Sequence, residues 1–180
     1  MTAGSAAAIN LAGVNNVATV NTSGQTGILA LSGFVSGGTI NLTGATGGGD
    51  VQAIITNAAL NSADVVNVKL TNSTGASVDF GKVTAAGVET INVSTVDAGT
   101  GANTAATVDI ATLVATGATK IMVSGNNGLN LTNAGNVAVT TFDASGVVGD
   151  GTNDTAANLA VTFVSENTTT TANVSITGGA

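Results

Sequence analysis

The 180-residue chain contains no cysteine, histidine, arginine, proline, tyrosine or tryptophan. The absence of cysteine excludes disulfides and thiolate metal sites, and without histidine or cysteine no Ser–His or Cys–His catalytic pair can form. Charged residues make up 7% of the chain, against about 25% in typical soluble proteins. The only cationic side chains, Lys69, Lys82 and Lys120, are scattered along a chain of net charge −7. Because a phosphate-binding face requires clustered lysine and arginine, nucleic acid is not an expected partner.

An enzyme is also not expected. Glu89, Glu166 and the aspartates could supply paired carboxylates for acid–base hydrolysis. Sugar-cleaving grooves, however, generally stack the substrate on aromatic rings, and lyases depend on basic residues. The glycine-rich segment Gly47–Gly49 is not followed by the Gly-Lys-Ser/Thr of a phosphate loop.

The hydropathy of the chain argues against two further classes of protein, disordered chains and membrane-spanning proteins. A mean hydropathy of +0.44 argues against disorder of the whole chain, which requires low hydrophobicity with high charge. No apolar run approaches the ~18 residues of a membrane span, so no membrane span is expected. Residues 1–8 have neither the basic patch nor the apolar core of a Sec signal peptide.

A short phrase of alternating apolar and polar residues, with asparagine in second place, recurs along the chain. It occurs at Ile9–Ala12, Ile40–Thr43, Val66–Lys69, Ile91–Ser94, Leu129–Thr132 and Ala172–Ser175. The period of two is that of a β-strand with one buried face, and turns rich in glycine, threonine and asparagine separate the phrases. A strand unit repeated in this way indicates stacked coils. If the asparagines occupy the same position on successive coils, their amides could form a hydrogen-bonded ladder; otherwise they simply face water.

We predict an all-β chain, residues 1–180, forming a single right-handed parallel β-solenoid segment with irregular coils; a β-sandwich is the alternative. Small aliphatic side chains can fill a narrow solenoid core without aromatic residues. In Val51–Ala63, helical spacing competes with the strand pattern. The expected strands are residues 7–12, 28–34, 39–44, 51–56, 64–71, 76–84, 88–95, 107–114, 119–124, 128–132, 137–143, 159–165 and 172–177.

The stretch from Val83 to Gly146 resembles a known family. It contains Gly-Val-Glu-Thr-Ile-Asn-Val, Val-Ser-Gly-Asn-Asn-Gly-Leu-Asn-Leu-Thr and Val-Thr-Thr-Phe-Asp-Ala-Ser. These phrases resemble the β-solenoid regions of surface-layer (S-layer) proteins and related RTX-type surface proteins that Gram-negative bacteria export by type I secretion. The resemblance implies a right-handed parallel β-solenoid, an extracellular position in a cell-surface lattice, and calcium between coils. It also implies an uncleaved C-terminal export signal; none is visible, and we interpret the chain as part of a longer surface protein.

Calcium is the one cofactor for which the residues suggest a site. Hard cations bind several oxygen ligands held in glycine-bearing turns, and the turn at 150–154 supplies Asp150, Asn153 and Asp154, with Asp143 expected one coil earlier. Asp50, after three glycines, is a second candidate, and Asp79, Asp97 and Asp109 are weaker ones. The alternative for each of these acids is a solvated turn residue or a cap, and the 150–154 turn is the one place where the residues favour that alternative no more than calcium.

The sequence therefore predicts a non-catalytic structural component of a bacterial surface layer, which assembles with copies of itself into a lattice or fibre with the help of calcium. A contact with cell-surface polysaccharide would require a region outside this chain. The alternative is a stalk or ligand-binding module of a large secreted adhesin.

Overall fold

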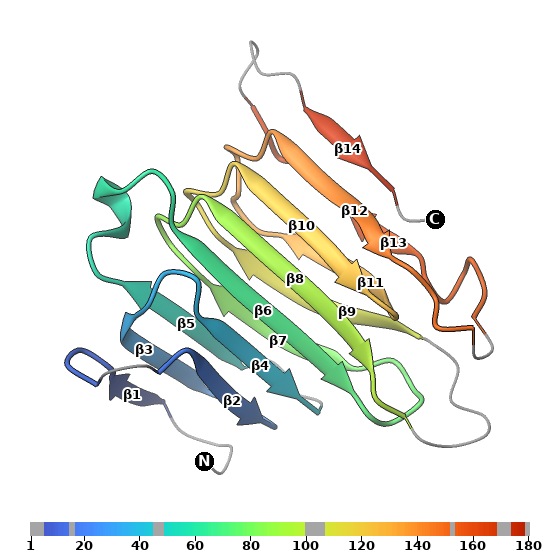
Figure 1. Ribbon diagram of the computed structural model, residues 1–180, viewed down its shortest axis with the longest axis horizontal. Helices are drawn as coiled ribbons and strands as arrows, with labels where there is room; N and C mark the ends of the chain where they lie inside the picture. The colour runs from blue at the N-terminus through green and yellow to red at the C-terminus, as the bar shows by residue number, and fades with distance from the viewer. Residues whose placement is uncertain are drawn as a thin grey trace.

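The computed structural model describes residues 6–14, 17–44, 49–99, 107–151, 154–168 and 174–178. These residues form fourteen strands in two parallel sheets of seven, and the chain alternates between the sheets at every strand (Figure 1). The first sheet contains β1 (Ala7–Asn10), β3 (Ile28–Phe34), β5 (Asp50–Ile55), β7 (Asp79–Thr84), β9 (Val108–Val114), β11 (Gly128–Asn133) and β13 (Val161–Phe163). The second contains β2 (Thr19–Ser23), β4 (Thr39–Thr43), β6 (Val65–Asn72), β8 (Thr90–Asp97), β10 (Lys120–Gly125), β12 (Thr141–Val147) and β14 (Ser175–Thr177).

This topology is a parallel β-solenoid with two strands per coil, as the sequence predicts. Each strand pairs with the strand two places away in the chain, and every pair is parallel. The alternative β-sandwich of antiparallel strands is therefore wrong. Coil length varies because the turns vary: a short 3-10 helix, η1 (Ala58–Leu60), extends the turn between β5 and β6.

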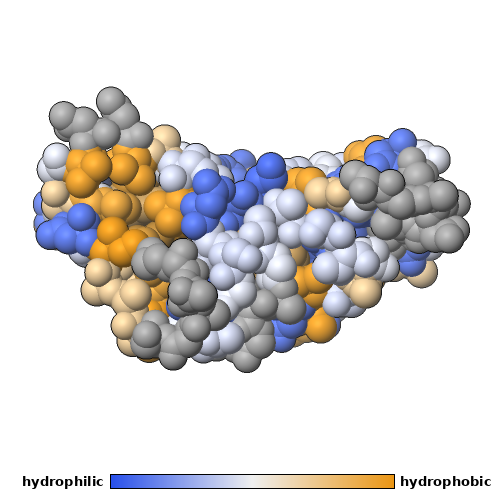
Figure 2. All heavy atoms as spheres, turned by 90° about the horizontal axis from the view of Figure 1, so that it is seen from below, coloured by the Kyte–Doolittle hydropathy of each residue, from blue (hydrophilic) through white to orange (hydrophobic). Residues whose placement is uncertain are grey.

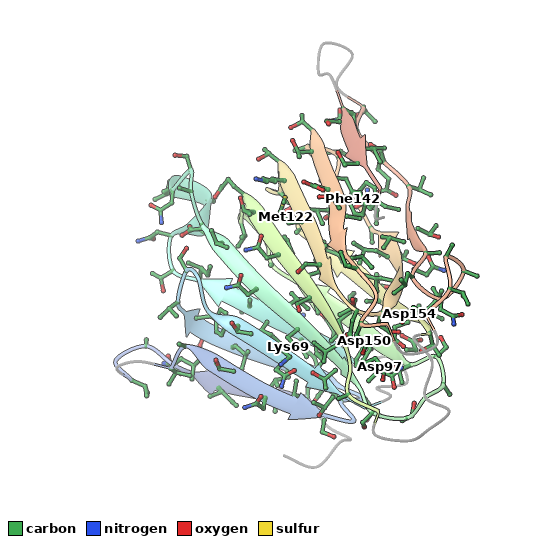
Figure 3. All side chains as sticks on the ribbon, turned by 45° about the vertical axis from the view of Figure 1, so that its right-hand side comes forward. Lys69, Asp97, Met122, Phe142, Asp150 and Asp154 are labelled. Atoms are coloured by element: carbon green, nitrogen blue, oxygen red, sulfur yellow. The ribbon has the colours of Figure 1, made fainter. Side chains whose placement is uncertain are left out.

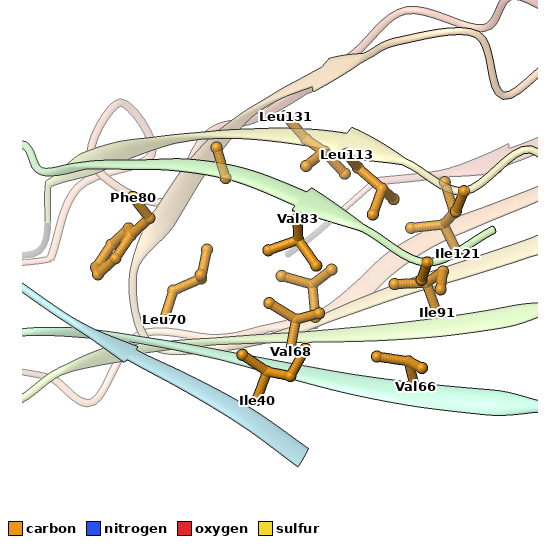
Figure 4. Packing of buried hydrophobic residues seen from close by; sticks show 14 of the residues in the cluster. Ile40, Val66, Val68, Leu70, Phe80, Val83, Ile91, Leu113, Ile121 and Leu131 are labelled. Atoms are coloured by element: carbon orange, nitrogen blue, oxygen red, sulfur yellow. The ribbon is translucent and has the colours of Figure 1, made fainter. Parts of the chain in front are cut away.

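The core lies between the two sheets and is filled by the apolar half of each alternating strand. Figure 4 shows Val68 of β6 and Val83 of β7 pointing toward one another across this interior. In β6 the alternate residues Val66, Val68 and Leu70 are buried, while the residues between them face outward. Full burial of such a side chain contributes roughly 1.5–3 kcal/mol, so the period-two pattern fixes which face of each strand points inward.

The predicted strands each overlap an observed strand, and one strand was missed. Residues 51–55 are extended, so the strand interpretation of that segment is confirmed, and only residues 58–60 are helical. The missed strand is β2. Its inward positions are Val20 and Thr22, which pair with Ile40 and Leu42 of β4. One aliphatic residue is too short a hydrophobic pattern to indicate a strand, and β2 depends on β4 for its pairing.

The asparagine phrases do not stack in one column. Asn67 and Asn92 are in register, and Nδ2 of Asn92 donates to Oδ1 of Asn67 at 2.8 Å. Asn41 bonds in the same way to Asn21 at 2.8 Å, but on its other side it lies opposite Lys69. The phrases at residues 9–12 and 129–132 lie on the other sheet, and Asn173 is outside the described residues. Among the described residues, the asparagine ladder is therefore limited to two separate pairs, Asn21–Asn41 and Asn67–Asn92.

Candidate functional site at the acidic edge

The solenoid has two long edges with different chemistry. Because all strands of a sheet are parallel, the turns that follow the even-numbered strands lie together along one edge, and those that follow the odd-numbered strands lie along the other (Figure 1). We call the first the acidic edge because six aspartates lie in its turns or at the strand ends beside them: Asp50, Asp79, Asp97, Asp109, Asp150 and Asp154.

Three of these aspartates lie at the end of β8 and in the turn after β12, two strands that are separated in the sheet by β10. Figure 3 shows Asp97, Asp150 and Asp154 toward the same end of the strands. Asn126 links two of them: its Oδ1 accepts the backbone N–H of Asp97 at 2.9 Å, and its Nδ2 donates to Oδ2 of Asp150 at 3.1 Å. Oδ2 of Asp154 accepts the N–H of Gly151 at 2.7 Å, which closes the turn that carries Asp150.

The predicted calcium ligands are not all brought together. Asp150 and Asp154 share a turn, whereas Asn153 lies outside the described residues. Asp143 is on the outer face of β12, opposite Met122, and accepts the N–H of Ser145 at 2.9 Å. Hydrogen bonds from the hydroxyl and the amide of Ser145 lower the pKa of Asp143, so it is a carboxylate at neutral pH.

Asp50 lies apart from the 150–154 turn, in the third coil. Its Oδ2 is 3.1 Å from Nζ of Lys82 and 2.9 Å from Nε2 of Gln52, and its Oδ1 accepts the Thr84 hydroxyl at 2.9 Å. These partners neutralise and saturate the carboxylate, so the structure makes Asp50 part of a polar network on the first sheet. Within the described part of the chain, no three acidic side chains are arranged as a metal site.

Asp109, one of the weaker candidates in the sequence, lies inside the protein. It is fully buried in β9, where Oδ1 accepts from Nδ2 of Asn72 at 2.8 Å and from the Val78 amide at 2.8 Å. Oδ2 accepts from Nδ2 of Asn127 at 2.6 Å. Burial raises the pKa of Asp109, the three hydrogen bonds oppose that rise, and the charge of Asp97 adds to it. The alternation of Ala111 and Leu113 places Asp109 on the inward face, which is the signal that could have found it.

Among the described residues, the coil at each end of the stack is paired with a neighbouring coil on one side only. β1 and β2 at one end, and β13 and β14 at the other, each pair with one strand only among the described residues. Apolar residues that face the interior there are only partly buried: Ala7, Ile9, Leu11 and Val20 at one end, and Leu159, Val161 and Phe163 at the other. Figure 2, which views the molecule from below, shows hydrophobic residues gathered on the left, on the side where β1 lies.

No protein-family model matches the chain, and a search of curated proteins found no match either. The described residues form no pocket. They also include no helix with the length and hydrophobicity needed to cross a bilayer.

Proposed function

We propose that this chain is a structural segment of a bacterial surface layer, which stacks end to end with copies of itself outside the cell. The observation that carries the proposal is that each end coil of the described stack is paired on one side only. Unpaired strand edges are templates for further strand pairing, and here each open edge coincides with a layer of partly exposed core residues. A second copy placed on the stack would satisfy the backbone groups and cover the apolar layer at the same time.

Calcium is the proposed cofactor of this assembly. A body of net charge −7 with six aspartates beside one edge repels its own copies. A divalent cation that binds carboxylate oxygens at the 150–154 turn would reduce this repulsion. Asn126 already joins the backbone of Asp97 to the Asp150 carboxylate, so an ion bound at Asp150 would reinforce an existing link between successive coils.

The proposal is tested by blocking one end coil. Val20 points into the open layer of β2, whereas the neighbouring Thr19 points outward. Val20→Lys places a charge in the stacking surface, so we expect it to remain monomeric by sedimentation velocity and electron microscopy, while the unmodified chain forms fibres or sheets. Thr19→Lys is the matched control and should assemble like the unmodified chain.

Two results would count against the proposed surface-layer function. If the unmodified chain remains monomeric at high concentration with calcium present, the proposal is wrong. If that monomer binds glycans or cell surfaces, the adhesin function replaces it. Circular dichroism must show that Val20→Lys keeps its β structure, because a misfolded variant would also fail to stack.

A further inference from the structure

Exposed aliphatic side chains are concentrated along the edge opposite the acidic edge. Eleven large hydrophobic residues of the described chain are exposed, and six of them lie in the turns that follow the odd-numbered strands. Two of the eleven, Ile28 and Val148, lie on the acidic edge. We call the six the aliphatic edge: Val14, Val35, Leu60, Val137, Val164 and Val174.

The aliphatic edge has a projection next to a low region. Leu60, in η1, is 83% exposed, and Figure 1 shows its turn extending beyond the neighbouring turns. The next two turns expose only small residues, Ala86, Thr116 and Thr119. These turns pack tightly: a Cβ on Gly117 would lie 2.8 Å from Cα of Gly87, and a Cβ on Gly87 would lie 3.0 Å from the amide nitrogen of Ala59. The projection and the low region are therefore held in fixed relative positions.

We propose that the aliphatic edge is the lateral contact between two copies of this chain, paired antiparallel about a two-fold axis at Ala86. Successive coils are about 4.8 Å apart, and a second copy presents its turns at the same repeat. Ala86 lies in the fourth of the seven turns along the aliphatic edge. A two-fold axis at this turn sets the first turn of one copy against the seventh of the other, the second against the sixth, and the third against the fifth. Val35 then faces Val137 of the other copy, and the projecting Leu60 faces the small Thr116. A parallel arrangement would instead set the two Leu60 projections against each other.

The distribution of charge favours the same edge. The acidic edge carries most of the aspartates and would repel its copy. On the aliphatic edge the charged residues are fewer and include Lys120. The carboxylates of Glu89 and Glu166 accept the backbone N–H groups of Asp64 (2.9 Å) and Gly135 (2.6 Å). This inference rests on the proposed function, because a two-dimensional layer requires a lateral contact in addition to end-to-end stacking.

Single cysteines test the contact, since the chain has none of its own. Under mild oxidation we expect Ala86→Cys to form a disulfide-linked dimer as its major species, and Val148→Cys, the exposed control on the acidic edge, to remain at background. A mixture of Val35→Cys and Val137→Cys should give the mixed dimer in preference to either self-dimer. Equal cross-linking of Ala86→Cys and Val148→Cys would overturn the contact, and preferential Val35→Cys self-dimers would overturn its antiparallel arrangement.

A second measurement separates this inference from the proposed function. Leu60→Lys should abolish lateral growth while fibres stacked end to end persist in electron micrographs, whereas Ile110→Lys on the first sheet should change neither. If Leu60→Lys forms the same broad layers as the unmodified chain, the lateral contact is wrong and the surface-layer function stands. If no variant and no unmodified chain assembles, the surface-layer function itself fails.

Discussion

The buried carboxylate of Asp109 gives the protein a pH response at the scale of one residue. All three of its described hydrogen-bond partners are N–H donors, on Asn72, Val78 and Asn127. This environment suits an anionic acceptor, whereas burial opposes the charge. Burial prevails and raises the pKa of Asp109, so the folded state holds its proton to a higher pH than the unfolded state does.

Because the pKa of Asp109 differs between the folded and unfolded states, the free energy of unfolding depends on pH. Stability from the protonated Asp109 is fully present below the unfolded pKa of about 4, and it is lost as pH rises through the raised folded pKa. We expect the unfolding free energy of the unmodified chain to fall relative to that of Asp109→Asn over this window, as measured by urea denaturation at a series of pH values. A difference that does not change with pH would contradict the prediction. At every pH the variant should be the less stable by roughly 1–3 kcal/mol, because its amide N–H₂ faces another donor.

At the scale of one element, the approach of β10 to β8 depends on a glycine. Gly125 ends β10 with φ +127°, and a Cβ there would lie 1.8 Å from the carbonyl oxygen of Thr95. The Thr95 hydroxyl donates to the Asn127 carbonyl at 2.7 Å in the same region. The strand end can therefore lie against its neighbour only if position 125 has no side chain.

Gly125→Ala should lower the free energy of unfolding by roughly 3–5 kcal/mol. The matched control is Gly135→Ala, which has φ +81° and no atom within 4 Å of the added Cβ. That control should lose only about 1–2 kcal/mol, the cost of a left-handed conformation. Chemical denaturation of both variants measures the difference, and equal losses would show that the close approach of the strands contributes nothing.

At the scale of the whole molecule, charge is divided between the two edges. Lys82 lies beside Asp50 and offsets its charge, and three other aspartates of the acidic edge, Asp97, Asp150 and Asp154, lie at the end of β8 and in the turn after β12. These positions belong to coils joined by the parallel pairing of β8, β10 and β12. An ion bound there would act on the stack as a whole, because no coil is stable without its neighbours.

Calcium should therefore raise the melting temperature, and a chelator should reverse the effect. An ion at about 100 times its Kd adds about 2.7 kcal/mol, which corresponds to several degrees. Asp150→Asn should weaken this response, whereas Asp79→Asn, whose carboxylate accepts the Gly81 amide on β7 at 2.8 Å, should retain it. A melting temperature that is the same with calcium and with chelator would remove calcium from the proposal. The readout is differential scanning calorimetry of the unassembled chain.

The sequence by itself determined the strands other than β2, and the inward face of each, because a period-two pattern of aliphatic residues can be buried in only one way. It also determined the narrow core, since few bulky side chains are available to fill a wider one. The tertiary structure decided the rest. The register that pairs Asn67 with Asn92 but places Asn41 opposite Lys69 is set by turn lengths between strands. The gathering of Asp97, Asn126 and Asp150, and the enclosure of Asp109 by Asn72 and Asn127, join residues from different coils. Nothing local in the chain encodes such contacts, because they exist only once the coils are stacked.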